Sequence, residues 1–172
     1  MTTPISFIVF LQTFGACIGI FTVVWGEYSY IHAMRDGVID AAERAHLHII
    51  GIGLRFGMTI LLLSSSFFVA SEYVLHSALQ PALTENYWIF IAFAFLIIGI
   101  SWALSRRYIL FTLGSAAIMT AWWLLLYLSL GRLWVHSFES AIALYTVLTV
   151  VVYGVLRYIH FLVLDNATKH FT

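Results

Sequence analysis

Five apolar runs constrain this chain more than any other feature of its sequence. They extend over approximately residues 4–33, 46–75, 87–104, 108–130 and 138–164, with short polar segments between them. Each run reaches the roughly 18 residues that a helix needs to cross the hydrocarbon core of a bilayer. Inside hydrocarbon only a helix satisfies its own backbone groups, and the alternating polarity of a barrel is absent. The sequence therefore predicts an all-α integral membrane protein, a bundle of five transmembrane helices.

The composition supports this class and excludes several others. Hydrophobic residues make up 62% of the 172 residues and charged residues only 9%, which is too little charge to cover a soluble domain. The formal net charge of zero offers no basic surface for nucleic acid. The single cysteine, Cys17, has no partner for a disulfide within the chain. Because there is no linker or internal repeat, residues 1–172 are predicted to form one domain in the lipid bilayer.

The distribution of basic residues predicts the direction of the helices. Short segments that follow the first and third runs carry arginines, whereas the second loop carries none and the fourth carries only Arg132. Basic residues concentrate on the cytoplasmic side of membrane proteins. We therefore expect the N-terminus outside and the C-terminus in the cytoplasm, in a bacterial inner membrane. The basic residues on the predicted cytoplasmic side are Arg35, Arg44, Arg106, Arg107, Arg157 and Lys169.

Three charged residues lie within the apolar runs, where charge is costly and commonly faces a bundle interior or a cavity. They are Glu27, Arg55 and Arg157, all in the half predicted to be cytoplasmic. One interpretation is a structural pair between Glu27 and an arginine, with the other arginine extending to the interface. The alternative is a pocket for an anionic group such as a lipid phosphate, a carboxylate or the propionates of haem.

Histidines at a similar depth favour a cofactor site in the same half. His48 and Arg55 are seven residues apart and share one face of their helix, as do Arg157 and His160. Haem b requires imidazoles from facing helices and cations near its propionates, which His48, His160 and the two arginines would supply. The alternative is that these histidines are interfacial residues without a ligand. The predicted haem site comprises Glu27, His32, His46, His48, Arg55, Arg157 and His160.

A second polar cluster is predicted at the opposite end of the bundle. Glu72 and His76 are four residues apart, and His136 and Glu139 are three apart, so each pair projects from one side of a helix. Carboxylate and imidazole pairs at this spacing suit a divalent metal such as Zn, Fe or Mn. The alternative is that they are solvated helix ends. Because His48 and His76 are separated by about 42 Å of helix, at ~1.5 Å per residue, this would be a separate site.

Small residues predict where the helices approach one another. Gly15 and Gly19, and likewise Gly53 and Gly57, are spaced four apart, which permits close backbone packing. The run 108–130 is rich in small residues and has no internal charge or histidine, so we interpret it as scaffold.

Three classes of function remain open. A small membrane cytochrome would hold haem b and exchange electrons with a quinone. A divalent-metal or proton-coupled transporter would use the two polar clusters in turn, although few polar residues connect them. A non-catalytic subunit would assemble with other membrane subunits in a larger complex. No Ser/His/Asp grouping or phosphate-binding loop assigns a catalytic residue, so enzymatic activity stays open.

Overall fold

The computed structural model describes residues 3–36, 41–74, 84–131 and 137–169. Side chains are described over 6–32, 48–71, 73–74, 84–131 and 137–163. These ranges contain five α-helices and no strand: α1 (Thr3–Asp36), α2 (Ala41–Val74), α3 (Glu85–Ser105), α4 (Phe111–Ser129) and α5 (Phe138–Lys169). Each is long and apolar enough to cross a membrane. The prediction of an all-α bundle of five membrane-spanning helices is confirmed.

The helices begin and end close to the predicted positions. The helices α1 and α5 continue past the predicted ends, to Asp36 and Lys169, and two helices begin at other residues than predicted. The helix α2 begins at Ala41 rather than near His46, because a helix continues through the polar residues that flank an apolar run. The helix α4 begins at Phe111 rather than Tyr108. The backbone of Arg107 has a φ of 59°, which is the left-handed conformation and ends the preceding helical segment.

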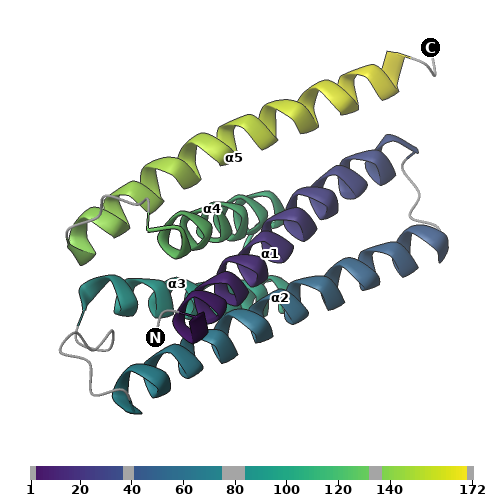
Figure 1. Ribbon diagram of the computed structural model, residues 1–172. Coiled ribbons are helices and arrows are strands. Elements are labelled where there is room, and N and C mark those ends of the chain that lie inside the picture. The colour runs from purple at the N-terminus through teal and green to yellow at the C-terminus, as the bar shows by residue number, and fades with distance from the viewer. Residues whose placement is uncertain (1–2, 37–40, 75–83, 132–136, 170–172) are drawn as a thin grey trace.

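The helices α1 and α2 form an antiparallel pair that packs along most of its length (Figure 1). Glycines allow this approach: a Cβ atom built on Gly57 would lie 3.0 Å from the carbonyl oxygen of Gly15 and 3.1 Å from the backbone nitrogen of Gly19. Gly53 packs against Thr22, where an added Cβ would lie 3.0 Å from the side chain. Gly57 therefore meets both glycines of the pair on α1, and the predicted close approach of the two helices is confirmed.

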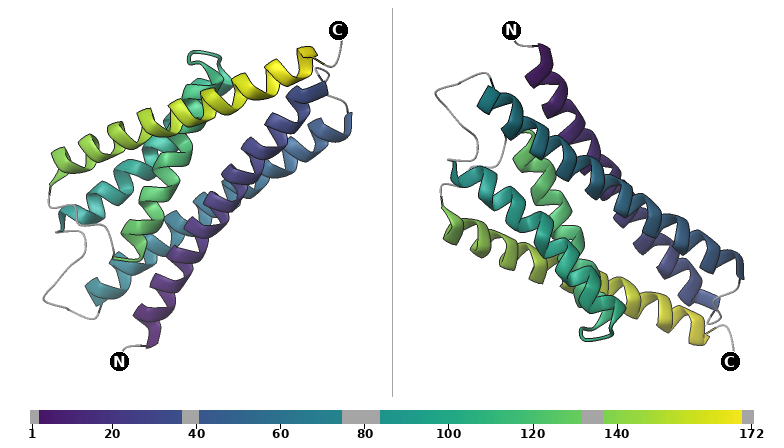
Figure 2. Two further views of the ribbon diagram at one scale, coloured as in Figure 1. Left: turned by 90° about the horizontal axis from the view of Figure 1, so that it is seen from above. Right: turned by 90° about the horizontal axis from the view of Figure 1, so that it is seen from below.

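The helix α4 lies at the centre of the bundle and contacts α1, α3 and α5 (Figure 2). Its small residues place its backbone close to its neighbours, and Trp122 is only 1% exposed. The ring of Trp122 occupies the space above Gly19, where a Cβ atom would overlap it. The close packing predicted from the small residues of this segment is confirmed.

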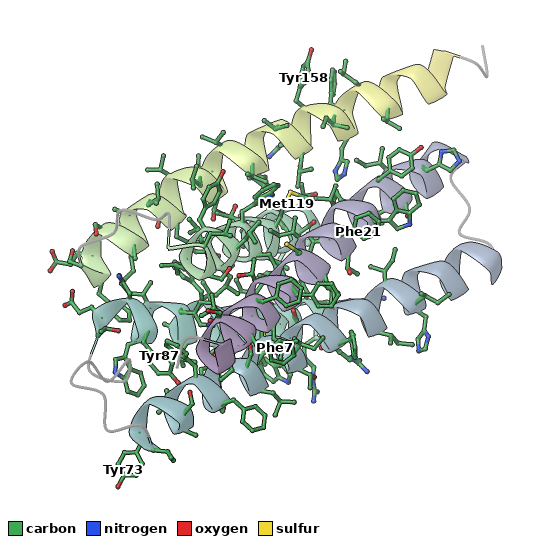
Figure 3. The ribbon with its side chains drawn as sticks, viewed as in Figure 1. Phe7, Phe21, Tyr73, Tyr87, Met119 and Tyr158 are labelled. Atoms are coloured by element: carbon green, nitrogen blue, oxygen red, sulfur yellow. The ribbon has the colours of Figure 1, made fainter. Side chains whose placement is uncertain are left out.

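The helix α1 lies between α2 and α5, so these two helices occupy opposite sides of the bundle (Figures 1 and 2). The helix α5 packs on α4 and also contacts α1. Tyr73 of α2 and Tyr158 of α5 are both exposed and point outward on opposite sides (Figure 3). Large apolar side chains are exposed along all five helices, which is the surface expected of a protein surrounded by lipid.

Candidate functional site

The carboxylate of Glu27 is the centre of a polar cluster inside the bundle. Glu27 lies on α1, within the membrane-spanning segment Ser6–His32, and its side chain is 5% exposed. Its Oε1 atom lies 3.1 Å from Nε2 of His160 on α5. The hydroxyl of Ser115 on α4 donates a hydrogen bond to its Oε2 atom. The first, fourth and fifth helices therefore meet at one carboxylate.

Both oxygens of the Glu27 carboxyl group have a hydrogen-bond partner. A carboxylate accepts hydrogen bonds at both oxygens, and here Ser115 occupies one oxygen and the imidazole of His160 the other. A buried charge without partners is strongly unfavourable in a medium of low dielectric constant, so the pairing is what allows a carboxylate at this position. If His160 carries a second proton, the contact becomes an ion pair.

An aromatic wall holds the imidazole of His160 in place. Tyr30 lies three residues after Glu27, on the same side of α1, and its ring centroid is 5.9 Å from that of His160. The Tyr30 ring also packs on Phe111 of α4, at a centroid distance of 4.3 Å. The side chain of His160 is 12% exposed, so the pair is nearly enclosed by protein.

A cavity of about 270 Å³ adjoins Glu27 and is bounded by α1, α2, α3 and α4. Its lining combines the carboxylate and hydroxyl groups of three helices with apolar side chains. The polar residues are Thr22, Glu27, Tyr30, Ser101 and Ser115. The apolar residues include Ile50, Leu54, Leu104, Phe111 and Ile118. A mostly apolar cavity with a few polar groups is typical of a binding site for a small molecule with a polar head group.

The arginines do not pair with Glu27. In the described part of the chain, the contact with His160 is the only ion pair. Arg157 is exposed, and its Nη1 atom donates a hydrogen bond to the hydroxyl of Tyr153 at 2.9 Å. Arg55 is exposed on α2. The interpretation of a structural pair between Glu27 and an arginine is therefore wrong, and the partner is a histidine.

The other histidines of the predicted haem site lie apart from this cluster or outside the described side chains. His48 is exposed on α2, on the far side of α1 from α5 (Figure 1). His32 is exposed near the end of α1, where its ring stacks on Tyr28 at a centroid distance of 6.4 Å. The side chain of His46 lies outside the described residues. Of the predicted residues, the structure brings Glu27 and His160 together, and it shows no contact between His48 and His160 among the residues it describes.

The predicted metal cluster at the opposite end falls largely outside the described residues. His76, His136 and the side chain of Glu72 lie there, while Glu139 is exposed in the first turn of α5. Among the side chains that are described, no group of three His, Cys, Asp or Glu residues lies close enough to hold a metal ion. This metal site stays a prediction.

Two residues of the site were not anticipated from the sequence. Ser115 lies in a stretch of small residues whose composition indicated only close packing, although a serine there also carries a hydroxyl group. Tyr30 lies three residues after Glu27, and this helical spacing is the signal that connects them.

Comparisons of the chain with models of protein families, with curated proteins and with solved structures find no match.

Proposed function

We propose that this membrane protein binds a small amphiphilic ligand in the cavity beside Glu27 and couples that binding to protonation of the Glu27–His160 pair. The observation that carries the proposal is a carboxylate, 5% exposed within a membrane-spanning helix, in contact with an imidazole and beside a cavity. Ionisable groups at such positions commonly serve proton transfer or ligand binding. This proposal belongs to the class of proton-coupled membrane carriers.

The pair suits proton exchange because either group can hold the proton they share. With Glu27 ionised, Nε2–H of His160 donates to Oε1 across 3.1 Å. When the carboxyl group is protonated, it can donate to the imidazole or to a ligand acceptor in the cavity. The hydroxyl group of Ser115 can accept or donate, so it can stay bonded in both states.

The walls of the cavity indicate the chemical class of the ligand. A carboxyl group and a few hydroxyl groups line the cavity together with aliphatic and aromatic side chains. A quinone head group has this character, since its carbonyl oxygens accept hydrogen bonds and its ring and tail are apolar. No group in the described cavity carries a positive charge, which favours an uncharged head group over an anion.

Titration with decylubiquinone, a soluble quinone, tests the proposal. Isothermal titration calorimetry in two buffers with different ionisation enthalpies would measure both the affinity and the number of protons taken up or released. We expect binding linked to a proton in the unmodified protein, and a loss of that linkage in Glu27→Gln. Glu139→Gln is the matched control, because Glu139 is an exposed carboxylate at the start of α5. Equal heats in both buffers for the unmodified protein would contradict the proton-linked function.

Haem b remains the second candidate, and one contact favours it. A histidine that ligates a metal commonly hydrogen bonds through its other ring nitrogen to a carboxylate, as His160 does to Glu27. Because Nε2 contacts Glu27, iron would be held through Nδ1, and Arg157 one turn earlier would supply a cation for a propionate. His48, on the other side of α1, does not supply the second ligand in this arrangement. When bound, haem would supply one-electron transfer.

An absorption spectrum separates the two candidates. A purified sample from haem-supplied cells should show a Soret band if the cytochrome proposal holds, and His160→Ala should abolish it while His32→Ala should not. A colourless preparation would contradict this second proposal and leave the first unaffected.

We also propose that the N-terminus lies outside and the C-terminus in the cytoplasm of a bacterial inner membrane. The support is the position of the basic residues: Arg106 and Arg107 connect α3 and α4 at the same end of the bundle at which α1 ends and α2 begins. The Glu27–His160 pair is nearer to this end and would then exchange protons with the cytoplasm.

A further inference from the structure

A second cavity, of about 410 Å³, lies between α2, α3 and α4 and contains an arginine. Arg55 of α2 lies within the membrane-spanning segment His48–Ser71, roughly 10 Å from its start at ~1.5 Å per residue. It is exposed on the surface of the bundle, and in the described part of the chain no carboxylate pairs with it. A guanidinium group at this depth requires an anionic partner or must extend to the membrane interface.

The same cavity is lined by a buried donor that lacks a partner. Trp122 is 1% exposed, and among the described atoms its indole Nε1 has no hydrogen-bond acceptor. The six-membered ring of the indole packs against Gly19 of α1, through the ring edge opposite Nε1. The N–H group is therefore directed away from α1. A buried N–H group without an acceptor is unusual in a folded protein, and a bound ligand is one source of the missing acceptor.

Two hydroxyl groups complete the polar part of this cavity. Thr59 lies one turn after Arg55 on α2, and Ser101 lies on α3; both residues are exposed. The hydroxyl of Thr59 donates to the backbone carbonyl oxygen of Arg55 at 2.8 Å and has lone pairs left to accept, whereas the hydroxyl of Ser101 can donate to a phosphate or carbonyl oxygen. Exposure within membrane-spanning helices means that the opening of the cavity meets lipid rather than water.

We propose that this cavity binds one anionic phospholipid, with its phosphate at Arg55 and an ester carbonyl oxygen at Nε1 of Trp122. The order of the donors fits this class of molecule. Trp122 lies eleven residues into the 19-residue helix α4, near its middle and deeper than Arg55. In a phospholipid the ester carbonyls lie deeper than the phosphate, and a lipid bound here is drawn inward from its bilayer neighbours so that a carbonyl oxygen reaches Nε1. Arginine forms strong charge-assisted hydrogen bonds to phosphate. The site stands independently of the proton-linked function, although Ser101 lines both cavities.

Native mass spectrometry of the purified protein tests the proposal. Phosphatidylglycerol, phosphatidylcholine and inorganic phosphate are added in separate arms. We expect one phosphatidylglycerol molecule to be retained in preference to phosphatidylcholine. Arg55→Gln should lower its retention roughly tenfold, and Trp122→Phe should lower it by a smaller factor. Arg55→Lys should keep most of the binding because it keeps the positive charge. Equal circular dichroism spectra and unfolding temperatures of Arg55→Gln and the unmodified protein show that the loss in Arg55→Gln is not a loss of folding.

Arg157→Gln is the matched control, because Arg157 is also an exposed arginine of a membrane-spanning helix but does not line this cavity. Its retention of phosphatidylglycerol should equal that of the unmodified protein. Equal retention of phosphatidylglycerol by the unmodified protein and Arg55→Gln would overturn the site and favour an arginine that reaches the interface. If inorganic phosphate displaced the lipid, the site would bind free phosphate rather than a phospholipid, and the proposal would be overturned.

Discussion

At the scale of single residues, the stability of the Glu27 cluster depends on both of its hydrogen-bond donors. Removing the imidazole in His160→Ala leaves a carboxylate that is 5% exposed with one side-chain donor fewer. When His160 is protonated the contact is an ion pair, and removing one partner of a buried ion pair commonly costs about 3–5 kcal/mol. We therefore expect a loss of that size in the free energy of unfolding, measured by denaturant titration in detergent micelles.

A double-mutant cycle separates this electrostatic cost from lost packing. In a Glu27→Gln background the buried group is neutral, so His160→Ala should cost less than in the unmodified protein. Arg157→Ala, on the exposed side of the same helix, should change stability little. An equal cost of His160→Ala in both backgrounds would show that the contact with Glu27 does not stabilise the fold.

A serine donor makes a smaller, separable contribution. Ser115→Ala removes the hydrogen bond to Oε2 of Glu27 and nothing larger than an oxygen atom. Loss of a hydrogen bond to a charged group costs about 1.5–3 kcal/mol. Ser105→Ala is the control, because Ser105 is exposed and bonds only the backbone of Trp102 among the described residues. Similar stabilities of the two variants would contradict the role given to Ser115.

The sequence identified Glu27 and His160 as site residues but did not identify Ser115 or Tyr30. Charge inside an apolar run identified Glu27 as a residue that needs a partner, and helical spacing identified His160 as polar at a similar depth. Spacing within a helix carries no information on which helices are neighbours. For that reason the sequence did not distinguish an arginine from a histidine as the partner of Glu27. Ser115 was interpreted only as one of the small residues of α4.

At the scale of the helices, backbone contact between α1 and α2 makes Gly57 sensitive to a single methyl group. An added Cβ would lie 3.0 Å from the carbonyl oxygen of Gly15, and backbone atoms cannot move aside without shifting a helix. Gly57→Ala should therefore destabilise the protein by about 1–3 kcal/mol. Thermal unfolding followed by circular dichroism measures this change.

Gly51 offers a control on the same helix. A Cβ built there meets none of the described atoms within 4 Å. Because alanine favours a helix over glycine by about 1 kcal/mol, Gly51→Ala should leave stability unchanged or raise it. A loss equal to that of Gly57→Ala would contradict the proposed importance of the α1–α2 contact.

Apolar length and glycine spacing predicted the helices and the α1–α2 contact because both are properties of the local sequence. For α4, the abundance of small residues predicted close packing but not a central position in the bundle. The position of α1 between α2 and α5 depends on how all the helices pack together. No pattern within a single helix specifies this order. This arrangement is also what separates His48 from His160.

At the scale of the whole molecule, the predicted orientation can be tested with single cysteines in a Cys17→Ala background. Glu85→Cys lies at the start of α3 and Arg106→Cys follows its end, so the two positions lie on opposite sides of the membrane. A maleimide that cannot cross membranes should label Glu85→Cys in intact bacterial cells, and Arg106→Cys only after lysis. The reverse pattern would place the N-terminus in the cytoplasm.

The central claim is that Glu27 exchanges a proton inside the membrane, and infrared difference spectroscopy measures this directly. Spectra of the protein in lipid at acid and neutral pH should contain the C=O stretch of a protonated carboxyl group that is absent in Glu27→Gln. The same band should persist in Glu139→Gln and shift in His160→Ala, because His160 contacts Oε1 of Glu27. Identical difference spectra for the unmodified protein and Glu27→Gln would contradict the claim, because they would show that Glu27 keeps one protonation state.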